Sequence, residues 1–561
     1  MAPFGVRQFR RLLAGCVTIN LVAFILATMS SVLAGQALGD KALTGVSLAS
    51  PLFTFGSFLM ALIGAGTGIN YSLRRGRLDL DGAESVFMQG VWTSLAGGVA
   101  LGLLAWLFRD SFIALMSSDP EVVNHAVTYW RWLPFGLALI CFSGVLCNCC
   151  YCDGDTFFAT IVSCSHCLVA LGVSAIALKC GYGSSSCSLG FSIGYLFAFL
   201  AYSLHFLRKS NTFSFSWRFC LKDTWVIVKT AAGDATGFLG DVLSYVLLGY
   251  VLSSSFGPRA LIGLPVYVFV VESHSFVNGF ASAMQPIVAV YYGERNARSV
   301  RTTMTNVFVT LVAVCGLYSA LLVVFPELVP SVLGVSDPSA VFIVRVSALM
   351  IVPGALINVL NNYFQLIEHE RLAVALTVFY WMVFPALLML VFPVFGDRSF
   401  WWWSPVSHWA GAALFAAFML WRYGRNHFPL LLDREREAAI HTFDLRLCEL
   451  DIAAAAESVS KKMLGFGVRR ELAMRARLLV EESLMVIKER NGEKTVFAEV
   501  TLDLNDGIVI TLRDDGVIFD ITDADARVSG LRTYLVATMM QHQSEKSNIL
   551  TTGFNRNVFR L

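Results

Sequence analysis

The stretch that decides the fold runs from Gly39 to Gly76 and reads GDKALTGVSLASPLFTFGSFLMALIGAGTGINYSLRRG. An altered copy runs from Gly257 to Gly293 and reads GPRALIGLPVYVFVVESHSFVNGFASAMQPIVAVYYG. In one register the identical residues include Gly39 with Gly257, Ala42 with Ala260, Leu43 with Leu261, Gly45 with Gly263, Ser57 with Ser275, Phe58 with Phe276 and Ala65 with Ala283. Each copy is a short polar turn followed by a long apolar helix. A repeat of this kind predicts a membrane protein whose two halves each hold six helices and run in the same direction.

The composition as a whole is that of a membrane protein. The chain is 56% hydrophobic and 15% charged, and its mean hydropathy is +0.64, which excludes an ordinary soluble globular protein. A net charge of +2 provides no strongly basic surface, so no nucleic-acid partner is expected. The N-terminal MAPFGVRQFRR is expected to be a cytoplasmic anchor, because no short apolar run ends at a small-residue cleavage site.

Twelve apolar segments are each long enough to cross a hydrocarbon core of about 30 Å as a helix. They cover residues 12–35, 46–71, 88–108, 129–151, 157–179, 189–207, 224–254, 261–291, 303–326, 340–366, 372–394 and 403–422. Basic residues gather at alternate ends of these segments, namely Arg7, Arg10, Arg11, Arg74, Arg75, Arg77, Arg208, Lys209, Arg218, Lys222, Arg295, Arg298, Arg301, Arg422, Arg425, Arg434 and Arg436. The positive-inside rule then places both termini in the cytoplasm. We therefore expect a multi-pass protein of the inner or plasma membrane, embedded in the lipid bilayer.

The thirteen cysteines show no spacing typical of a disulfide framework. One cluster does not converge on a single helix face and has no histidine at ligand spacing: Cys147, Cys149, Cys150 and Cys152. This favours helix packing, and no metal site is expected. Cys180 and Cys187 lie in a predicted outward loop and form a disulfide if the compartment is oxidising, which the sequence leaves open.

After Arg422 the chain becomes a mixture of charged and apolar residues without a membrane-length segment. Residues 469–492 have a helical apolar period that ends at Asn491-Gly492. The alternating segments TVFAEVTLDL and GIVITLRDD flank Asn505-Asp506-Gly507, which predicts a hairpin. A further helix over residues 530–540 and a closing strand, NVFRL, complete the pattern. The order helix, helix, hairpin, helix, strand predicts an α+β sandwich.

Ionisable residues within membrane segments are candidate functional residues, because they are costly to bury there. The seventh segment holds Asp234 and Asp241, whose spacing places them on one helix face. The eighth holds Glu272, close to His274. A carboxylate cluster at this depth can hold Na⁺ or exchange a proton. The alternative is structural, with Asp234 near the cytoplasmic entrance and Glu272 packed against His274.

Polar residues in the first half give a weaker signal. Asn20 is the obvious polar residue deep in the first segment, where it either contacts substrate or bridges helices. Thr54 stands at the position that Glu272 occupies in the second copy, so the acidic cluster belongs mainly to the second half. His274 is expected to be a structural partner rather than a ligand.

The repeat resembles a known family. LGDKALTGVSLASPL and GAGTGINYSLRRGRLDLDGAESVFMQG resemble the start of the multidrug and toxin extrusion (MATE) transporters, within the multidrug/oligosaccharidyl-lipid/polysaccharide exporter group. FGPRALIGLPVYVFV with MQPIVAVYYGERNARSV is similar to the start of that family's C-terminal lobe, and CDGDTFFA to its Gly-Asp turn. The resemblance covers about residues 1–425. It implies two lobes around a central cavity, alternating access driven by Na⁺ or H⁺, and export of organic cations or similar amphipathic molecules. Ser30 stands where the family often has an acidic residue.

The last domain has a resemblance of its own. LLVEESLMVIKERN, ITLRDDGVIFD, SGLRTYLV and GFNRNVF are similar to GHKL-type ATP-binding domains of the anti-sigma-factor and histidine-kinase group. This resemblance implies ATP as a ligand and assigns roles by motif: Glu482 (or Glu481) as base, Asp514 to adenine, Gly516 to the turn and Gly530 to the second glycine box.

Two departures from that family bear on catalysis. The position of its Mg²⁺-binding Asn is Val486, which has no oxygen for a hard cation. The glycine-rich lid is reduced to Ser529-Gly530, which leaves fewer backbone amides for phosphates. The domain is therefore read as a non-catalytic nucleotide sensor, as a degenerate module that binds a regulatory protein partner, or as an active ATPase or kinase, with the first favoured.

The predicted fold is an all-α polytopic membrane protein of twelve helices in two lobes, residues 1–215 and 216–428, followed by a linker at 429–439 and an α+β domain at 440–561. The predicted function is that of a Na⁺- or H⁺-coupled antiporter for organic cations or drugs, regulated by the last domain. It is a secondary transporter rather than an enzyme, with no catalytic residues and no required cofactor.

Two alternatives remain open. A lipid-linked oligosaccharide flippase needs a cavity lined with Lys and Arg, whereas the spans hold few, and Arg345 is isolated. A membrane signalling protein would bind a regulator through its soluble domain.

Overall fold

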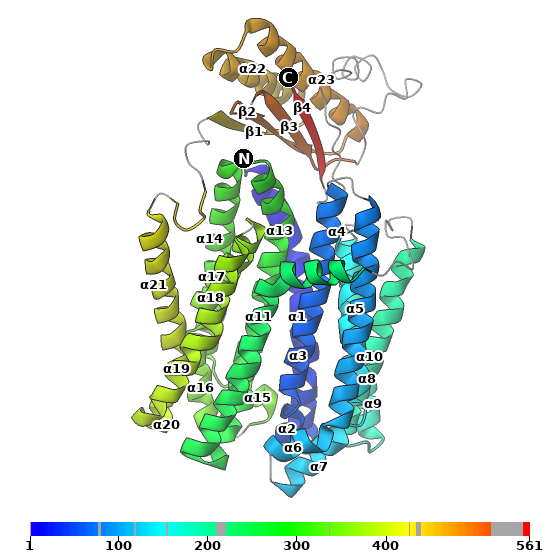
Figure 1. Ribbon diagram of the computed structural model, residues 1–561, viewed down its shortest axis with the longest axis vertical. Coiled ribbons are helices and arrows are strands. Elements are labelled where there is room, and N and C mark those ends of the chain that lie inside the picture. Colours follow the sequence, from blue (N-terminus) through cyan, green and yellow to red (C-terminus); the bar gives the residue numbers. More distant parts are fainter. Residues whose placement is uncertain are drawn as a thin grey trace. The chain divides into compact units, whose positions relative to one another are not determined.

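The computed structural model describes residues 2–76, 80–116, 119–152, 155–208, 220–335, 337–367, 369–425, 427–432, 439–505, 507–517 and 554–561. The chain divides into two compact units. One comprises Leu12–Gln285 and Val307–Met419, and the other Met1–Arg11, Pro286–Asn306 and Leu420–Leu561. Figure 1 shows the long helices of the first unit running alongside one another.

In the described residues of the first half of the membrane region, all regular secondary structure is helical. Its helices are α1 (Phe4–Leu38), α2 (Asp40–Ser47), α3 (Ser50–Met60), α4 (Gly66–Gly76), α5 (Leu80–Leu107), α6 (Arg109–Met116), α7 (Pro120–Tyr129), α8 (Leu133–Cys152), α9 (Thr156–Lys179) and α10 (Ser185–Ser203). A π-helical turn at Ala61–Ala65 joins α3 to α4. The second predicted segment is therefore a continuous span with a local irregularity.

The second half repeats this pattern with more interruptions. Its helices are α11 (Leu221–Val251), α12 (Gly263–Ser273), α13 (Val277–Gly293), α14 (Ala297–Val324), α15 (Leu328–Leu333), α16 (Ser339–Ala348), α17 (Ile351–Leu366), α18 (Glu370–Thr377), α19 (Phe384–Val391), α20 (Asp397–Phe400) and α21 (Trp403–Tyr423). A 3₁₀ turn at His274–Phe276 separates α12 from α13, and a π-helical turn at Val378–Val383 separates α18 from α19.

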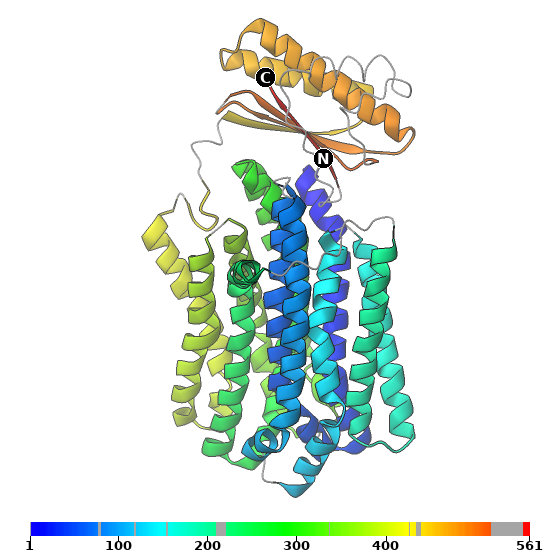
Figure 2. The ribbon, with the colours of Figure 1, turned by 45° about the vertical axis from the view of Figure 1, so that its right-hand side comes forward.

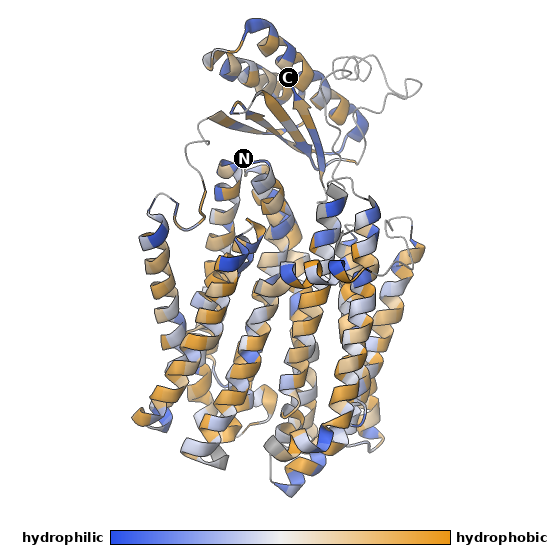
Figure 3. Cartoon of the chain, viewed as in Figure 1, coloured by the Kyte–Doolittle hydropathy of each residue, from blue (hydrophilic) through white to orange (hydrophobic). Residues whose placement is uncertain are grey.

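The apolar character of the helices fits a membrane. Within the described residues, nine helices are long and apolar enough to cross one, or ten if the bent pair α16 and α17 forms a single span. The predicted first and twelfth segments correspond to α1 and α21, which are helices but are not among these. Figure 3 shows apolar residues along the long helices, with hydrophilic residues gathered near many of their ends. The protein is thus a multi-pass membrane protein, and the count of twelve stays a prediction.

The sequence repeat is also a repeat of backbone conformation. Gly39 precedes α2 with φ 90° and ψ −179°, and Gly257 precedes the corresponding helical turn with φ 85° and ψ 172°. A side chain would be strained at either position, because only glycine adopts this region readily. This explains why both copies begin with glycine.

A second repeated glycine permits close helix packing. A Cβ atom on Gly45 would lie 2.8 Å from the carbonyl oxygen of Val122 in α7, and one on Gly263 would lie 2.6 Å from the Trp401 ring. Neither contact leaves room for a methyl group. The two copies therefore use matched glycines to bring neighbouring segments into contact.

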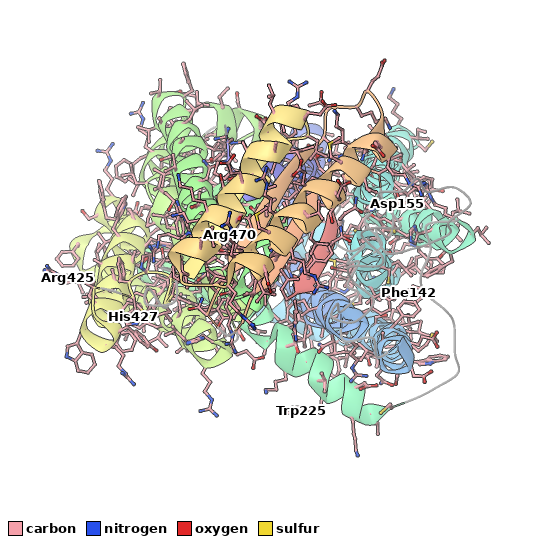
Figure 4. The ribbon with its side chains drawn as sticks, turned by 90° about the horizontal axis from the view of Figure 1, so that it is seen from above. Phe142, Asp155, Trp225, Arg425, His427 and Arg470 are labelled. Atoms are coloured by element: carbon pink, nitrogen blue, oxygen red, sulfur yellow. The ribbon has the colours of Figure 1, made fainter. Side chains whose placement is uncertain are left out.

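The C-terminal domain combines two helices with an antiparallel sheet. It contains β1 (Ile440–Arg446), α22 (Glu449–Gly465), α23 (Arg470–Asn491), β2 (Phe497–Asp503), β3 (Val509–Asp514) and β4 (Asn555–Arg560). The strand order is β1-β2-β3-β4. Figure 2 shows α22 and α23 over one face of this sheet, and Figure 4 shows the two helices side by side, with Arg470 in the first turn of α23. Their apolar faces form one core with Val500, Leu502 and Ile510.

Most of this order agrees with the predicted pattern. The helix over 469–492 and the hairpin are confirmed, since β2 pairs with β3 from Ala498↔Asp514 to Asp503↔Val509. The predicted helix at residues 530–540 lies outside the described residues. Strand β1 was not predicted, because its apolar residues are separated by His441, Asp444 and Arg446 and its length is only 7 residues.

Candidate functional site

The structure brings two of the predicted acidic residues together through a tyrosine. Asp241 and Tyr245 lie one turn apart on α11, and the Tyr245 hydroxyl donates a hydrogen bond of 3.0 Å to Glu272 Oε1 on α12. Asp241 and Glu272 are both half-buried and close enough to interact electrostatically. Two carboxyl groups this close favour a bound cation or a shared proton, because either relieves their mutual repulsion.

A break in the helix places Glu272 at the end of α12. The regular helix stops at Ser273, and the 3₁₀ turn His274–Phe276 follows. The ring of His274, in this turn, contacts the carbonyl oxygen of Val271 in α12. This agrees with a structural role for His274, whereas Glu272 takes Tyr245 as its hydrogen-bond partner. Interrupted helices commonly line binding sites in transporters.

A second tyrosine connects the acidic pair to polar groups of neighbouring helices. Tyr267 on α12 interacts electrostatically with Asp241 and approaches Met350 Sδ, which accepts a 3.0 Å hydrogen bond from Ser404 of α21. Sequence reasoning missed these residues; the signal that could have found Tyr245 and Tyr267 is a tyrosine hydroxyl within an apolar segment.

The other predicted residues do not join this cluster in the described part of the chain. The Asn20 amide nitrogen donates to the carbonyl oxygen of Cys16, in the preceding turn of α1, at 2.8 Å. Asp234 lies in α11, but its side chain is outside the described residues. Thr54, the counterpart of Glu272, donates to Ser50 O at 3.1 Å, and Ser30 is buried. The two halves of the repeat are therefore chemically unequal here.

Polar contacts join the two halves of the membrane region at the end that carries most arginines. Arg74 of α4 forms an ion pair of 2.7 Å with Asp223 of α11, and Ser85 of α5 donates to the same carboxylate at 2.6 Å. Gln89 of α5 donates to Thr224 at 2.6 Å. Asp223 is only 5% exposed, so these contacts are largely buried. We call the contacts of Asp223 with Arg74 and Ser85 the latch.

A separate contact joins the halves at the opposite end. The Gln36 amide nitrogen, near the end of α1, donates to the carbonyl oxygens of Ser331 (2.7 Å) and Val332 (3.0 Å) in α15. A Cβ atom on the neighbouring Gly35 would lie 2.3 Å from Leu333 O. The halves are therefore in contact at both ends.

In the C-terminal domain, the residues implied by the nucleotide-binding resemblance form a compact turn after β3. Asp514 Oδ1 accepts from the Gly516 amide at 3.0 Å and from Asn555 Nδ2 at 2.8 Å. Burial raises the pKa of Asp514 to about 6. A Cβ atom on Gly516 would lie 2.4 Å from Asn491 Nδ2, and Asn491 Oδ1 accepts from the amide of Val517 at 2.8 Å. Asn491 and Asn555, which the sequence did not single out, thus hold this turn.

The other residues that the nucleotide-binding resemblance implies lie in α23 or outside the described residues. Glu482 is half-buried in α23, whereas Val486 belongs to the apolar core. A valine in the apolar core has no oxygen that could bind a metal ion. Gly530 lies outside the described residues. Cys180 and Cys187 are both free in the structure.

The membrane region has two helical halves that share a repeated turn and are in contact at both ends. One half carries an acidic cluster. These features are typical of a polytopic helical membrane protein of the transporter type. The family model MatE matches residues 16–176 and 243–392, which is more than half of the chain. The chain belongs to the MatE family. MatE proteins are secondary transporters rather than enzymes.

Individual relatives agree with this assignment. The chain is 26% identical over 125 residues to a probable multidrug resistance protein NorM of Pseudomonas putida, a match that covers 22% of this chain and 27% of that protein. The chain thus matches about a quarter of the length of this curated relative.

Solved structures show the same fold. An outward-facing multidrug resistance MATE transporter of the MOP superfamily has a TM-score of 0.65 at 19% identity, over 77% of this chain and 99% of that one. A MOP superfamily transporter from Pyrococcus furiosus, described as having a binding pocket of reverse polarity, has a TM-score of 0.65 at 19% identity, over 77% of this chain and 100% of that one.

Proposed function

We propose that the chain is a cation-coupled exporter of organic cations or similar amphipathic molecules that works by alternating access. The observation that carries this proposal is the cluster of Asp241, Tyr245 and Glu272 within the apolar helices of a MatE protein. Na⁺ or H⁺ would relieve the repulsion between the two carboxylates. Its arrival and departure would then be coupled to the conformation of α11 and α12.

The experiment is dye efflux from proteoliposomes under an imposed Na⁺ or H⁺ gradient. We expect one gradient to drive efflux of a lipophilic cationic dye, and Asp241→Asn and Glu272→Gln each to abolish the coupling. Glu121→Gln is the control, because Glu121 is an exposed residue paired with Lys41 outside the cluster. If neither gradient drives efflux, the proposal that the chain is a cation-coupled antiporter is wrong. If efflux occurs but both cluster variants behave as wild type, the assignment of Asp241 and Glu272 as coupling residues is wrong.

A saccharide-lipid flippase is less well supported. Its pyrophosphate group requires basic residues in the transport path. Arg345, the isolated basic residue noted in the spans, is 52% exposed at its side chain and lies 3.9 Å from Glu327. Because this arginine is exposed and lies beside an acidic residue, it is poorly suited to bind a buried diphosphate.

We further propose that the C-terminal domain binds a nucleotide without hydrolysing it and regulates transport. The Asp514 carboxylate and the Gly516 turn have the residue types that recognise adenine in GHKL domains, while Val486 lies in the core. Labelled ATP binding by the full chain, with and without Asp514→Ala, tests this. Asp451→Asn, an exposed aspartate of α22, is the matched control. Equal binding by wild type and Asp514→Ala would remove the site.

A further inference from the structure

The sheet of the C-terminal domain has a second face that is also buried, and within the described residues neither α22 nor α23 covers it. Alternation along the strands points Ala498, Val500 and Leu502 toward α22 and α23, and Glu499, Thr501 and Arg513 to the other side. Arg513 is 0% exposed and Glu499 is 1% exposed. Charged side chains are almost never buried to this degree unless another part of the structure pairs with them.

The end of α13 and the turn before α14 supply the partners. The Tyr291 hydroxyl donates to Glu499 Oε2 at 2.8 Å, and the Arg513 guanidinium lies 4.7 Å from the Tyr291 ring centre. Glu294, in the turn, forms ion pairs with both Arg513 and Arg556. Arg513 also pairs with Glu499. Two arginines and two glutamates thus form one neutral cluster, which we call the charge cluster.

The beginning of α1 packs on the same surface. The Phe4 amide donates to Asp444 Oδ1 of β1 at 2.6 Å, and the Phe4 ring meets Phe554 edge-on at 5.5 Å. The Arg7 guanidinium lies 3.3 Å from the ring centre of Phe497. These contacts fall within one compact unit, which contains Met1–Arg11, Pro286–Asn306 and the C-terminal domain.

The two transporter segments also touch each other beneath the sheet. A Cβ atom on Gly5 would lie 2.7 Å from Tyr291 Cε2 and 2.8 Å from Thr303 Oγ1. No side chain larger than hydrogen fits between α1 and α13 at this point. One segment comes from the first half of the repeat and the other from the second half, and both carry the arginines that predict the cytoplasmic side.

We propose that this second face of the sheet is an intramolecular docking surface that clamps the start of α1 to the α13–α14 turn and thereby restrains the transport cycle. The inference rests on the proposed function, because alternating access requires the two halves to move against each other. A domain that holds one segment from each half lowers the rate of that movement. The charge cluster makes the hold specific, since Glu294 of the α13–α14 turn pairs with two arginines of the C-terminal domain, Arg513 and Arg556.

Hydrogen exchange and transport of the full chain in lipid nanodiscs and proteoliposomes test the clamp. Arg513→Ala removes the central cation, and Glu294→Gln weakens the same cluster from outside the C-terminal domain, so that the domain can still fold. We expect both changes to speed amide exchange in residues 2–11 and 291–296 by about tenfold or more, and to raise the dye efflux rate at least about twofold. Lys488→Ala is the control, because Lys488 pairs with Glu449 on the surface of the same domain.

The outcomes separate the two proposals. Unchanged exchange in Glu294→Gln would overturn the docking surface, whether or not the protein transports. Faster exchange with unchanged or slower efflux would overturn the clamp while leaving the transporter intact. If the wild type exports no dye under any gradient, the proposed function fails, and the docking surface is still decided by the exchange rates.

Discussion

At the scale of single residues, the hydrogen bond between Tyr245 and Glu272 is the most specific feature of the acidic cluster. A hydrogen bond to a charged group contributes about 1.5–3 kcal/mol, more than one between neutral groups. Tyr245 sits one turn beyond Asp241, so a single hydroxyl lies beside both carboxylates. The tyrosine thus controls the environment of the pair without carrying a charge itself.

Tyr245→Phe should weaken ion coupling because Glu272 loses its hydroxyl donor. We expect gradient-driven efflux to fall roughly 10-fold or more, with the ion concentration for half-maximal transport shifted. Stopped-flow efflux from proteoliposomes over a range of Na⁺ or H⁺ concentrations measures both. Tyr250→Phe is the matched control, since Tyr250 lies in the same helix but is 66% exposed. An equal effect of the two substitutions would contradict a role for the Tyr245 hydroxyl.

Asp514 provides a second residue-level prediction, which concerns pH. Its pKa in the folded domain is about 6 because burial disfavours the charged form, compared with about 3.9 in an unfolded chain. The folded state therefore holds a proton that the unfolded state releases between about pH 4 and 6. The corresponding stability is fully present below pH 4 and is lost as the pH rises through 6, on the order of 3 kcal/mol.

Asp514→Asn should remove this pH dependence while keeping the turn, because an amide oxygen still accepts hydrogen bonds from Gly516 and Asn555. Amide exchange of β3 in the full chain, measured at pH 5 and pH 7.5, reports local stability. The wild type should lose protection at the higher pH once the intrinsic exchange rate is corrected for, and the variant should lose less. Burial also raises the pKa of Glu499, opposite Arg513 of β3, to about 8, so both proteins keep the part of the loss that this residue causes. A similar loss in both proteins would assign the pH dependence elsewhere.

At the scale of elements, the repeat is held in place by glycines with different tasks. Gly39 and Gly257 adopt a backbone conformation that other residues rarely occupy, whereas Gly45 and Gly263 lie against neighbouring atoms. The sequence showed the repeat but not the reason for each match. The structure separates turn glycines from packing glycines.

Alanine at these positions should destabilise the membrane region by both routes. We expect Gly257→Ala to cost about 1 kcal/mol or more from backbone strain, and Gly263→Ala a further 1–3 kcal/mol, roughly, from overpacking against Trp401. Thermal unfolding of the purified protein in detergent shows which of the two substitutions is more destabilising. Gly172→Ala in α9 is the control, since its Cβ meets nothing within 4 Å, and alanine there should be neutral or stabilising.

Sequence patterns predicted long elements well and local interruptions poorly. Apolar runs located the helices because each run matches the thickness of a bilayer, and alternation located the β2–β3 hairpin. The 3₁₀ turn after Ser273 has no glycine or proline to announce it, so the position of Glu272 beside a break came only from the structure. Partners from distant segments, such as Tyr245 for Glu272 or Asn555 for Asp514, depend on packing that no local pattern encodes.

At the scale of the whole molecule, the two halves of the membrane region are joined by contacts of different strength. Gln36 donates to backbone oxygens at an exposed position, which costs little to break because water can replace it. The Arg74–Asp223 pair is largely buried and shares its carboxylate with Ser85. Removing one partner of such a pair leaves an uncompensated charge, which is destabilising by about 3–5 kcal/mol when burial is complete and by less here.

Asp223→Asn should therefore open the halves at the latch more readily than any change at an exposed ion pair. Cys220 lies three residues before Asp223, and its amide donates to Gln89 Oε1 at 3.0 Å, so its thiol reports on the same end of the bundle. We expect maleimide labelling of Cys220, followed by peptide mass spectrometry on the protein in nanodiscs, to speed roughly 5- to 10-fold in the variant.

Lys229→Gln is the control for the latch, because Lys229 also lies in α11 but forms an exposed pair with Glu370 at 3.7 Å, a contact that contributes about 0–1 kcal/mol. It should leave the labelling of Cys220 unchanged. If Asp223→Asn and Lys229→Gln have the same effect, the buried pair does not hold the halves together. If only Asp223→Asn speeds labelling, the energy that opposes opening is concentrated in one carboxylate, contributed by the second half of the repeat and held by an arginine and a serine of the first.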